Sequence, residues 1–312
     1  MVQLKGKKLP AIVGPTATGK TDLSLALAER LGKVELIYAD SLAVYKYLDI
    51  GTDKPPASFR ERVPHHLVDF LDPGERWSAF QFKKEAIYLQ REIRERGNLP
   101  LVVGGTAFYL QALYRSFLFV GAPAENNIRI AFERLPTEKL YALLQNVDPR
   151  RAQKIGKHDR KRLIRALEIF EKTGRPPSLF SPRPSSFSPL LIGIRWDRDK
   201  LKERICRRVE EMFERGIVEE VEELFSRGYS EDIPALDNFT YRPIVKLLRG
   251  DISRKEAQEE IVRGTFRFLK TQINWFKKAP VIWIEGEGKP LSILVEETCA
   301  IIKRNLVEED AK

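Results

Sequence analysis

Short apolar runs alternate with amphipathic stretches along the first part of the chain. The runs cover 9–14 (LPAIVG), 34–40 (VELIYAD), 65–71 (HHLVDFL) and 99–106 (LPLVVGGT). Between them, 21–31 and 79–96 carry apolar residues at helical spacing. Apolar strands that alternate with helices predict a parallel α/β sheet. Such sheets bind ligands at the carboxyl ends of their strands, where Gly14, Asp40 and Gly104–Thr106 all fall.

The strand pattern stops between about 121 and 174. Segments such as 137–144 and 160–172 have the apolar spacing of helices. Residues 175–189 (RPPSLFSPRPSSFSP) are rich in Pro and Ser, which predicts an extended connector.

Strand patterns return at 189–196 (PLLIGIRW) and 279–285 (APVIWIE), with helices between them. We therefore predict an α/β P-loop-type core formed by 1–120 and 190–312. A helical insertion, with its Pro- and Ser-rich connector, occupies 121–189.

Composition narrows the classes of protein. Apolar residues make up 43% of the 312 residues, which argues against disorder. The two cysteines, Cys206 and Cys299, lie far apart and exclude a zinc knuckle or a disulfide scaffold. No apolar run approaches the ~20 residues of a membrane span, and the N-terminus leads straight into the first strand. We expect a cytoplasmic protein with no membrane contact.

A phosphate-binding loop follows the first strand. GPTATGKT (14–21) fits the pattern G-x-x-x-x-G-K-[ST] without a gap. Its backbone amides point at an anion, Lys20 adds a charge, and the Thr21 hydroxyl is suited to holding Mg²⁺. The predicted phosphate-binding residues are Gly14, Pro15, Thr16, Ala17, Thr18, Gly19, Lys20 and Thr21.

The loop alone does not identify the phosphate. A nucleoside triphosphatase needs an apolar strand that ends in a Mg²⁺-holding Asp, but LVVGGT ends in glycines and Thr106. Asp40 does end a strand, yet Ser41 and Tyr45 follow it in a loop. The sheet therefore accepts a diphosphate without showing the usual γ-phosphate machinery.

Positive charge is clustered in two places. Lys plus Arg number 54 against 44 acidic residues, a net charge of +10, and residues 150–165 contain eight Lys or Arg and one Asp. On 256–278, Arg263, Arg267, Lys270 and Asn274 share a face other than the one that carries the apolar stripe. A charged run is more often a solvated face, but two such faces favour a nucleic acid partner.

An arginine pair occurs on the helical stretch 201–215. Arg204 and Arg208 are four residues apart on one outward face. Such a pair suits a diphosphate. An ion pair with Glu203 or Glu211 is the alternative, and spacing alone does not choose between them.

Several segments in fixed order resemble the tRNA dimethylallyltransferase (tRNA isopentenyltransferase) family. They are GPTATGKT, ADSLAVYKYLDIGTDKP (39–55), PHHLVDFLDPGERWSAFQF (64–82), LVVGGTAFYLQAL (101–113), VDPRRAQKIGKHDRKRLIRALEIFEKTGRP (147–176) and RICRRVEEMFERGIVEEVEELFSRGY (204–229). The resemblance covers roughly residues 9–280.

The resemblance implies transfer of a dimethylallyl group from its diphosphate to N6 of adenosine 37 in tRNA, with Mg²⁺ as cofactor. The loop would then hold the diphosphate leaving group, which Lys20, Thr21 with Mg²⁺ and Arg208 would stabilise. Asp40 would be the base near N6, and Thr106 would hydrogen-bond near the adenine or the donor. From the residues alone, a helix cap or a structural acceptor is the favoured role of Asp40.

The resemblance also implies contacts with the anticodon stem-loop, from which the target base must be extruded. The residues placed at tRNA are Asp40, Ser41, Leu42, Ala43, Thr106, Arg129, Lys161, Arg162, Leu163, Ile164, Arg165, Phe239, Thr240, Tyr241 and Arg242. We expect the enzyme to act as a monomer.

Three positions depart from the family pattern. Thr240 stands where the family usually has Gly, Phe266 replaces an Arg, and Thr271 replaces the Arg of Lys-Arg-Gln, while Arg267 adds a charge nearby. Three other functions remain open: a P-loop small-molecule kinase, a free-nucleotide prenyltransferase, and a tRNA-binding protein whose loop has lost its role.

Overall fold

A computed structural model describes residues 8–114, 126–180 and 187–307. They belong to two compact units. The core unit comprises residues up to Tyr114 and from Ser186 onward, and the helical unit comprises Arg115–Ser185. The predicted domain boundary at 120/121 lies outside the described residues, as does part of the predicted connector.

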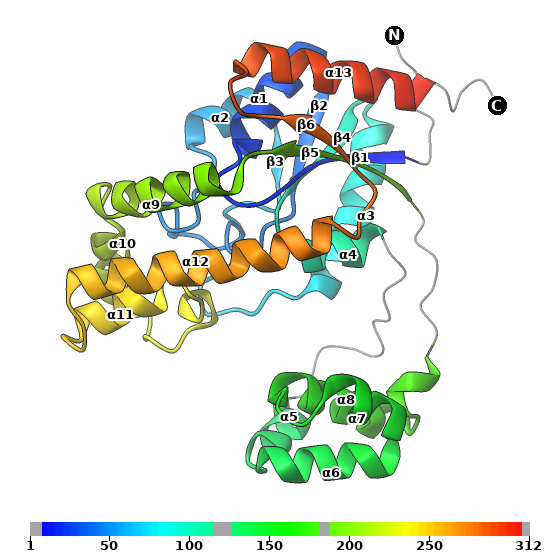
Figure 1. Ribbon diagram of the computed structural model, residues 1–312, viewed down its shortest axis with the longest axis vertical. Coiled ribbons are helices and arrows are strands. Elements are labelled where there is room, and N and C mark those ends of the chain that lie inside the picture. Colours follow the sequence, from blue (N-terminus) through cyan, green and yellow to red (C-terminus); the bar gives the residue numbers. More distant parts are fainter. Residues whose placement is uncertain (1–7, 115–125, 181–186, 308–312) are drawn as a thin grey trace. The chain divides into compact units, whose positions relative to one another are not determined.

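A six-stranded parallel sheet forms the centre of the core unit (Figure 1). Its strands are β1 (Lys8–Val13), β2 (Val34–Tyr38), β3 (His65–His66), β4 (Leu99–Gly104), β5 (Ser188–Arg195) and β6 (Val281–Glu285). Their order is β3-β2-β4-β1-β5-β6. The predicted parallel α/β architecture is confirmed, and β1 lies between a strand before the helical unit and one after it.

The third predicted strand is much shorter than its apolar run. β3 covers only His65–His66, because Leu67 and Asp69 adopt left-handed backbone angles (φ 62° and 58°) that end the strand. After β3, Leu71 forms an isolated parallel β-bridge with Tyr45.

Helices cover both faces of the sheet. The helices of the core unit are α1 (Lys20–Leu31), α2 (Ala57–Arg62), α3 (Ala79–Glu95), α4 (Ala107–Tyr114), α9 (Arg198–Glu214), α10 (Ile217–Ser226), α11 (Arg242–Leu248), α12 (Arg254–Phe276) and α13 (Leu291–Val307), with a short 3₁₀ turn η2 (Pro234–Leu236). α1 and α13 lie together on one face, and α3 and α4 pack against the other (Figure 1).

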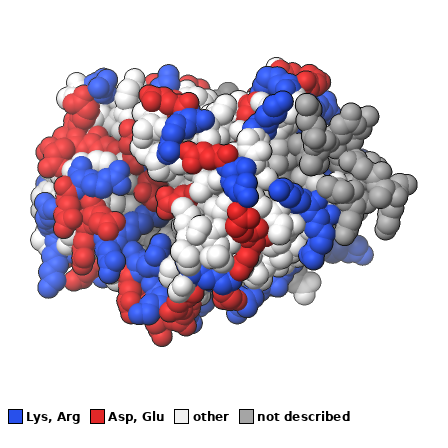
Figure 2. All heavy atoms as spheres, turned by 90° about the horizontal axis from the view of Figure 1, so that it is seen from above, with Lys and Arg blue, Asp and Glu red and all other residues white. Residues whose placement is uncertain are grey.

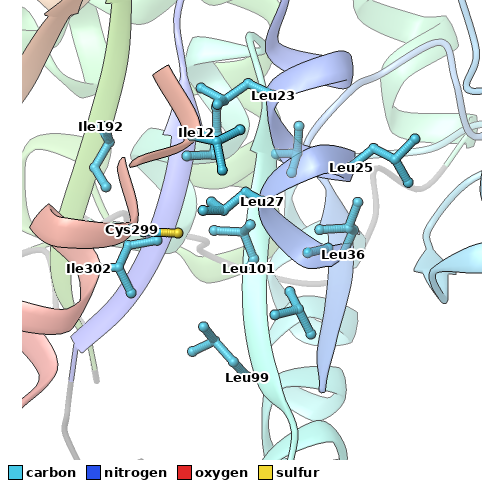
Figure 3. Packing of buried hydrophobic residues seen from close by; sticks show 14 of the residues in the cluster. Ile12, Leu23, Leu25, Leu27, Leu36, Leu99, Leu101, Ile192, Cys299 and Ile302 are labelled. Carbon is cyan, nitrogen blue, oxygen red and sulfur yellow. The ribbon is translucent and has the colours of Figure 1, made fainter. Parts of the chain in front are cut away.

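The main core lies between the sheet and the pair α1 and α13. Leu23 and Leu27 of α1 meet Ile12 and Ile192 of the central strands, and Cys299 of α13 closes the cluster (Figure 3). All five are fully or almost fully buried. This packing fixes α1 against the end of β1, and so fixes the loop that joins them.

A second apolar core supports the segment that follows β2. Val44, Leu48, Val209 and Tyr241 belong to this cluster, which joins that segment to α9, α10, α11 and the start of α12. Within it, Glu220 of α10 accepts hydrogen bonds from the amides of residues 49–51 at 2.6, 2.6 and 3.2 Å. The segment 39–55 is therefore held firmly although it contains no regular helix or strand.

The helical unit has a small core of its own. It contains α5 (Asn126–Glu133), α6 (Thr137–Val147), α7 (Pro149–Ile155), α8 (Arg160–Thr173) and the 3₁₀ turn η1 (Pro177–Leu179). Leu140, Leu144, Ala152, Leu163 and Leu167 are buried between these helices. The helical pattern predicted for this region is thus what the described residues form.

Charge is mixed on the face that carries α1 and α13. Figure 2 shows Lys and Arg interspersed with Asp and Glu there, without a continuous basic surface. Across residues 8–114, 126–180 and 187–307, no helix is long and apolar enough to cross a membrane.

Candidate active site

Three neighbouring strands end at one cavity of about 530 Å³. β2, β4 and β1 are adjacent in the sheet, so the segments that follow them meet at its carboxyl edge. The cavity is lined by Thr16, Ala17, Thr18, Gly19, Lys20, Thr21, Asp22, Tyr38, Asp40, Ala43, Asp53, Val103, Gly104, Gly105, Arg204, Arg207, Arg208, Phe268 and Gln272, among others. Sequence segments far apart in the chain therefore share one site.

The phosphate loop wraps from β1 into the first turn of α1. Gly14, Ala17 and Gly19 have positive φ angles of 146°, 62° and 84°, which curl the backbone and let α1 start at Lys20. The Lys20 ammonium donates to the Pro15 carbonyl at 2.6 Å across the loop. Burial, with a smaller effect of the Arg208 charge, lowers the pKa of Lys20 to about 8.

Two arginines of α9 reach the loop. Arg204 donates from Nε to the Ala17 carbonyl at 2.7 Å, and Arg208 donates from Nη1 to the Thr16 hydroxyl at 2.6 Å. Glu203, one of the alternative partners considered from spacing, pairs with Lys200 instead. Asp53 is the acidic neighbour of Arg208, with the two side chains 3.7 Å apart.

Gln272 of α12 joins the two glycine-bearing loops, and the sequence analysis did not include it in the site. Its Oε1 accepts from the Thr16 amide at 3.1 Å, and its Nε2 donates to the Gly105 carbonyl at 2.7 Å. Only 1% of Gln272 is exposed. A Cβ on Gly105 would lie 2.6 Å from that Nε2, so the contact requires glycine there. The sequence feature that could have identified Gln272 is its position as a polar residue on the apolar stripe of 256–278.

Asp40 lies opposite the phosphate loop at the end of β2. Its Oδ1 accepts hydrogen bonds from the amides of Leu42 and Ala43 at 2.8 and 3.2 Å, which forms a turn. Among the residues that the structure describes, none donates to its Oδ2. Oδ1 is therefore structural, and Asp40 is also one of the residues that line the cavity.

Thr106 supports the Asp40 turn rather than lining the cavity. Its hydroxyl accepts from the Ser41 amide at 3.3 Å, and its own amide donates to the Ala39 carbonyl at 3.2 Å. Gly14, Pro15, Ser41 and Leu42 likewise lie beside the cavity without forming its wall.

The residues present suit a Mg²⁺ ion that is shared with a phosphate ligand. The Thr21 side chain is joined at the cavity by the carboxylates of Asp22 and Asp53. Burial and the Asp53 charge raise the pKa of Asp22, the electrostatic situation that a cation relieves. Within the described part of the chain, no three His, Cys, Asp or Glu side chains could hold a metal ion by themselves. Substrate oxygens would have to complete the coordination.

The segment 239–242 is mostly internal. Tyr241 is fully buried, and its hydroxyl donates to Glu220 at 2.8 Å, while Thr240 is 5% exposed. The rings of Phe239 and Phe268 are tilted by 38° with 5.5 Å between their centroids, and Phe268 lines the cavity. Arg242 is exposed and pairs with Asp237.

Of the predicted tRNA-binding residues in the helical unit, some are exposed and others are buried. Lys161 and Arg162 are exposed, whereas Leu163 and Ile164 are buried in the unit's core. Any RNA contact at the latter two positions would have to come from the backbone. Arg165 and Arg129 both flank the buried carboxylate of Glu168, at 3.0 and 3.6 Å.

Comparison with known protein families gives a match over most of the chain. The IPP transferase family model matches residues 43–279. The tRNA dimethylallyltransferase 1 of Citrifermentans bemidjiense is 42% identical over 301 residues, which are 94% of this chain and 97% of that protein. The tRNA dimethylallyltransferase of Carboxydothermus hydrogenoformans is 40% identical over 93% of this chain and 96% of its own.

Two solved structures are similar over most of this chain. The full-length tRNA isopentenylpyrophosphate transferase of Bacillus halodurans gives a TM-score of 0.73 at 35% identity, covering 98% of this chain and 99% of that one. A eukaryotic dimethylallyltransferase acting on tRNA gives a TM-score of 0.78 at 27% identity, covering 91% and 75%.

Proposed function

The chain belongs to the tRNA dimethylallyltransferase (IPP transferase) family, and we propose that it transfers a dimethylallyl group from dimethylallyl diphosphate to N6 of adenosine 37 in tRNA, releasing diphosphate. It is a prenyl-transferring enzyme, as the family's name states. The proposed roles of single residues are argued from the cavity.

One observation carries the proposal: a carboxylate and a phosphate loop share a single cavity. Asp40 stands on the wall opposite Lys20 and Arg208, and apolar side chains such as Val103 and Phe268 complete the lining. This combination suits an anionic leaving group with a short hydrocarbon tail and an acceptor that loses a proton.

The leaving group is proposed to bind in the phosphate loop. When the bond between C1 of the dimethylallyl group and the diphosphate oxygen breaks, negative charge collects on diphosphate. The loop amides, the Lys20 ammonium and the Arg208 guanidinium are placed to stabilise that charge. Arg208 lines the cavity, and its hydrogen bond from Nη1 to the Thr16 hydroxyl keeps the guanidinium beside the loop.

The acceptor amine is proposed to be activated by Asp40. N6 of adenine forms the new bond to C1 and must lose one proton, which the free Oδ2 would accept. The turn held by Oδ1 fixes the direction of the carboxylate. Thr106 would act through this turn, because it binds the Ser41 amide beside Asp40.

Mg²⁺ is proposed as the cofactor. The Thr21 hydroxyl, with Asp22 or Asp53, would hold it against the diphosphate oxygens. When bound there, the ion would neutralise part of the charge on the leaving group.

The anticodon stem-loop of tRNA is proposed as the partner of the basic helical unit. Exposed cations on α8, Lys161 and Arg162, suit contacts to phosphates, which position an RNA without reading its sequence. We expect a monomer that works in the cytoplasm, where unmodified tRNA is found.

The test is incubation of the protein with dimethylallyl diphosphate, Mg²⁺ and unmodified tRNA, followed by mass analysis of the nucleosides. The proposal expects an adenosine that is heavier by one dimethylallyl group and stoichiometric release of diphosphate. If only free adenosine monophosphate were prenylated, the substrate would be a nucleotide and not tRNA. Turnover of ATP without RNA, and no prenylated product, would favour a kinase and contradict the proposal.

A further inference from the structure

Trp196 contacts the phosphate loop from outside the cavity. It follows β5 directly, and its indole Nε1 donates a hydrogen bond to the Thr18 carbonyl at 3.2 Å. Thr18 is the middle of the loop, where the backbone must turn its amides toward an anion. A carbonyl held on the outside of a tight loop leaves the neighbouring amides facing the inside.

Arg204 holds the adjacent carbonyl and rests on the same indole. Its guanidinium carbon lies 4.4 Å from the centroid of the Trp196 ring, within the range of a cation–π interaction. Its Nε donates to the Ala17 carbonyl at 2.7 Å. Two successive loop carbonyls, at Ala17 and Thr18, therefore accept hydrogen bonds from Arg204 and Trp196, and these two side chains also contact each other.

The Trp196 indole lies against Gly286, which has no side chain. A Cβ on Gly286, which follows β6, would lie 2.6 Å from the Trp196 Nε1 atom and 2.6 Å from the Cγ2 atom of the buried Ile194. The ring also packs on an apolar cluster that includes Ala17 of the loop and Phe266 of α12. Phe266, which replaces a family Arg, packs against the same cluster as Trp196 and Ala17.

We propose that Trp196 is a positioning residue that, with Arg204, sets the phosphate loop for diphosphate before the ligand arrives. The inference rests on the proposed function, because it takes diphosphate as the ligand of the loop. Trp196 would then determine the shape of the loop without touching the ligand. Without the indole, the Ala17–Thr18 backbone would be free to turn, and binding would have to restore the order that was lost.

A nearby pair of the same chemistry serves as a matched control. The Arg195 guanidinium lies 5.6 Å from the Trp283 ring, where β5 and β6 pair, and Arg195 also binds Glu285. Neither Trp283 nor Arg195 lines the cavity. Trp283→Phe therefore changes the same type of residue in the same sheet without touching the phosphate loop.

The experiment measures the affinity of the full chain for inorganic diphosphate by calorimetry. Trp196→Phe keeps an aromatic ring but loses the N–H, and we expect the Kd to rise about five- to tenfold. Trp283→Phe should bind diphosphate as wild type does. With tRNA as acceptor, Trp196→Phe should raise the KM for dimethylallyl diphosphate by a similar factor and leave kcat nearly unchanged. A role in folding alone would lower kcat by reducing the active fraction and leave KM and Kd intact.

The failures of the two proposals are distinguishable. A wild-type protein that does not bind diphosphate would overturn the proposed function. A wild-type protein that binds it, beside a Trp196→Phe variant that binds it equally well, would overturn only the positioning role. Equal losses in Trp196→Phe and Trp283→Phe would overturn it as well.

Discussion

Arg208 donates a hydrogen bond to the hydroxyl of Thr16 at 2.6 Å, joining α9 to a loop 192 positions earlier in the chain. The Nε of the same guanidinium is buried and, within the described residues, has no acceptor. Arg208 is therefore anchored to the phosphate loop through Nη1, and its side chain lines the cavity.

Arg208→Gln should impair the departure of diphosphate. We expect kcat to fall about 10²–10³-fold, because a donor placed at developing charge contributes that much in other enzymes. The measurement is single-turnover transfer to tRNA. Lys202→Gln is the control, since Lys202 lies on the same helix and pairs with Asp199 at the surface. Unchanged transfer in Arg208→Gln would remove this arginine from the reaction.

Asp40→Asn should separate the two roles of Asp40. The amide oxygen of Asn can still accept from the Leu42 and Ala43 amides, so the turn and the affinity for tRNA should persist. The side chain can no longer take a proton, and transfer should fall about 10²–10⁴-fold. Asp40→Ala would remove the turn as well and is less informative. Asp40→Asn with the wild-type transfer rate would show that Asp40 is not the base.

Gln272→Leu should weaken the connection between the two loops. It leaves the Thr16 amide and the buried Gly105 carbonyl without a partner, at a cost of about 1–3 kcal/mol in the free energy of unfolding. We expect a lower Tm and a raised KM for dimethylallyl diphosphate. Asn274→Leu, at an exposed position on the same helix, is the control. If both variants behave as wild type, the bridge has no energetic role.

Diphosphate binding should weaken as the pH rises through the pKa of Lys20. That pKa is about 8 in the free protein, because burial and then Arg208 disfavour the charged form. Diphosphate favours the charged ammonium, so below about pH 8 no proton needs to be taken up. Above it, each unit of pH should reduce affinity by up to about tenfold, with proton uptake on binding.

The Lys20 prediction is checked by calorimetry in two buffers of different ionisation enthalpy. Diphosphate itself titrates in this range, so Lys20→Arg is the reference, because Arg stays charged. The wild-type protein should show the steeper loss of affinity with pH. Equal slopes in the two proteins would contradict a titrating Lys20.

The cations of α8 should divide into structural and RNA-binding groups. Arg160 donates to the carbonyls of Glu133 and Leu135 and to the Thr137 hydroxyl, so Arg160→Gln should lower the stability of the helical unit. The double change Lys161→Gln and Arg162→Gln should leave the Tm unchanged and weaken tRNA binding. Its salt dependence should become shallower by about 1–2 in the log–log slope. An unchanged slope would exclude these two side chains from the RNA interface.

The sequence was sufficient for the parts of the site that are local in the chain. Apolar runs located the strands, and the loop 14–21 and Asp40 fall where a parallel sheet binds ligands. The helical spacing of Arg204 and Arg208 correctly placed both on one face, which contacts the loop. Their partner was ambiguous, because spacing within a helix does not show what lies opposite it.

The remaining contacts depend on packing between distant segments. Gln272 enters the site only because α12 crosses the ends of β1 and β4, and nothing local in 265–276 identifies the Thr16 amide as its partner. The hydroxyl of Thr106 accepts a hydrogen bond from the Ser41 amide, a contact between distant segments that the sequence does not indicate. The shortening of β3 follows from backbone angles at Leu67 and Asp69 that an apolar run conceals.

The position of β1 between β4 and β5 has a consequence for how the protein is made. On the ribosome, the phosphate loop emerges well before β5, Trp196 and Gln272, and the helical unit is translated in between. Domains fold as units during synthesis, so the helical unit can be complete while the catalytic sheet still lacks a central neighbour. A nascent chain released before α12 would carry the phosphate loop 14–21 but not Gln272, which joins that loop to Gly105.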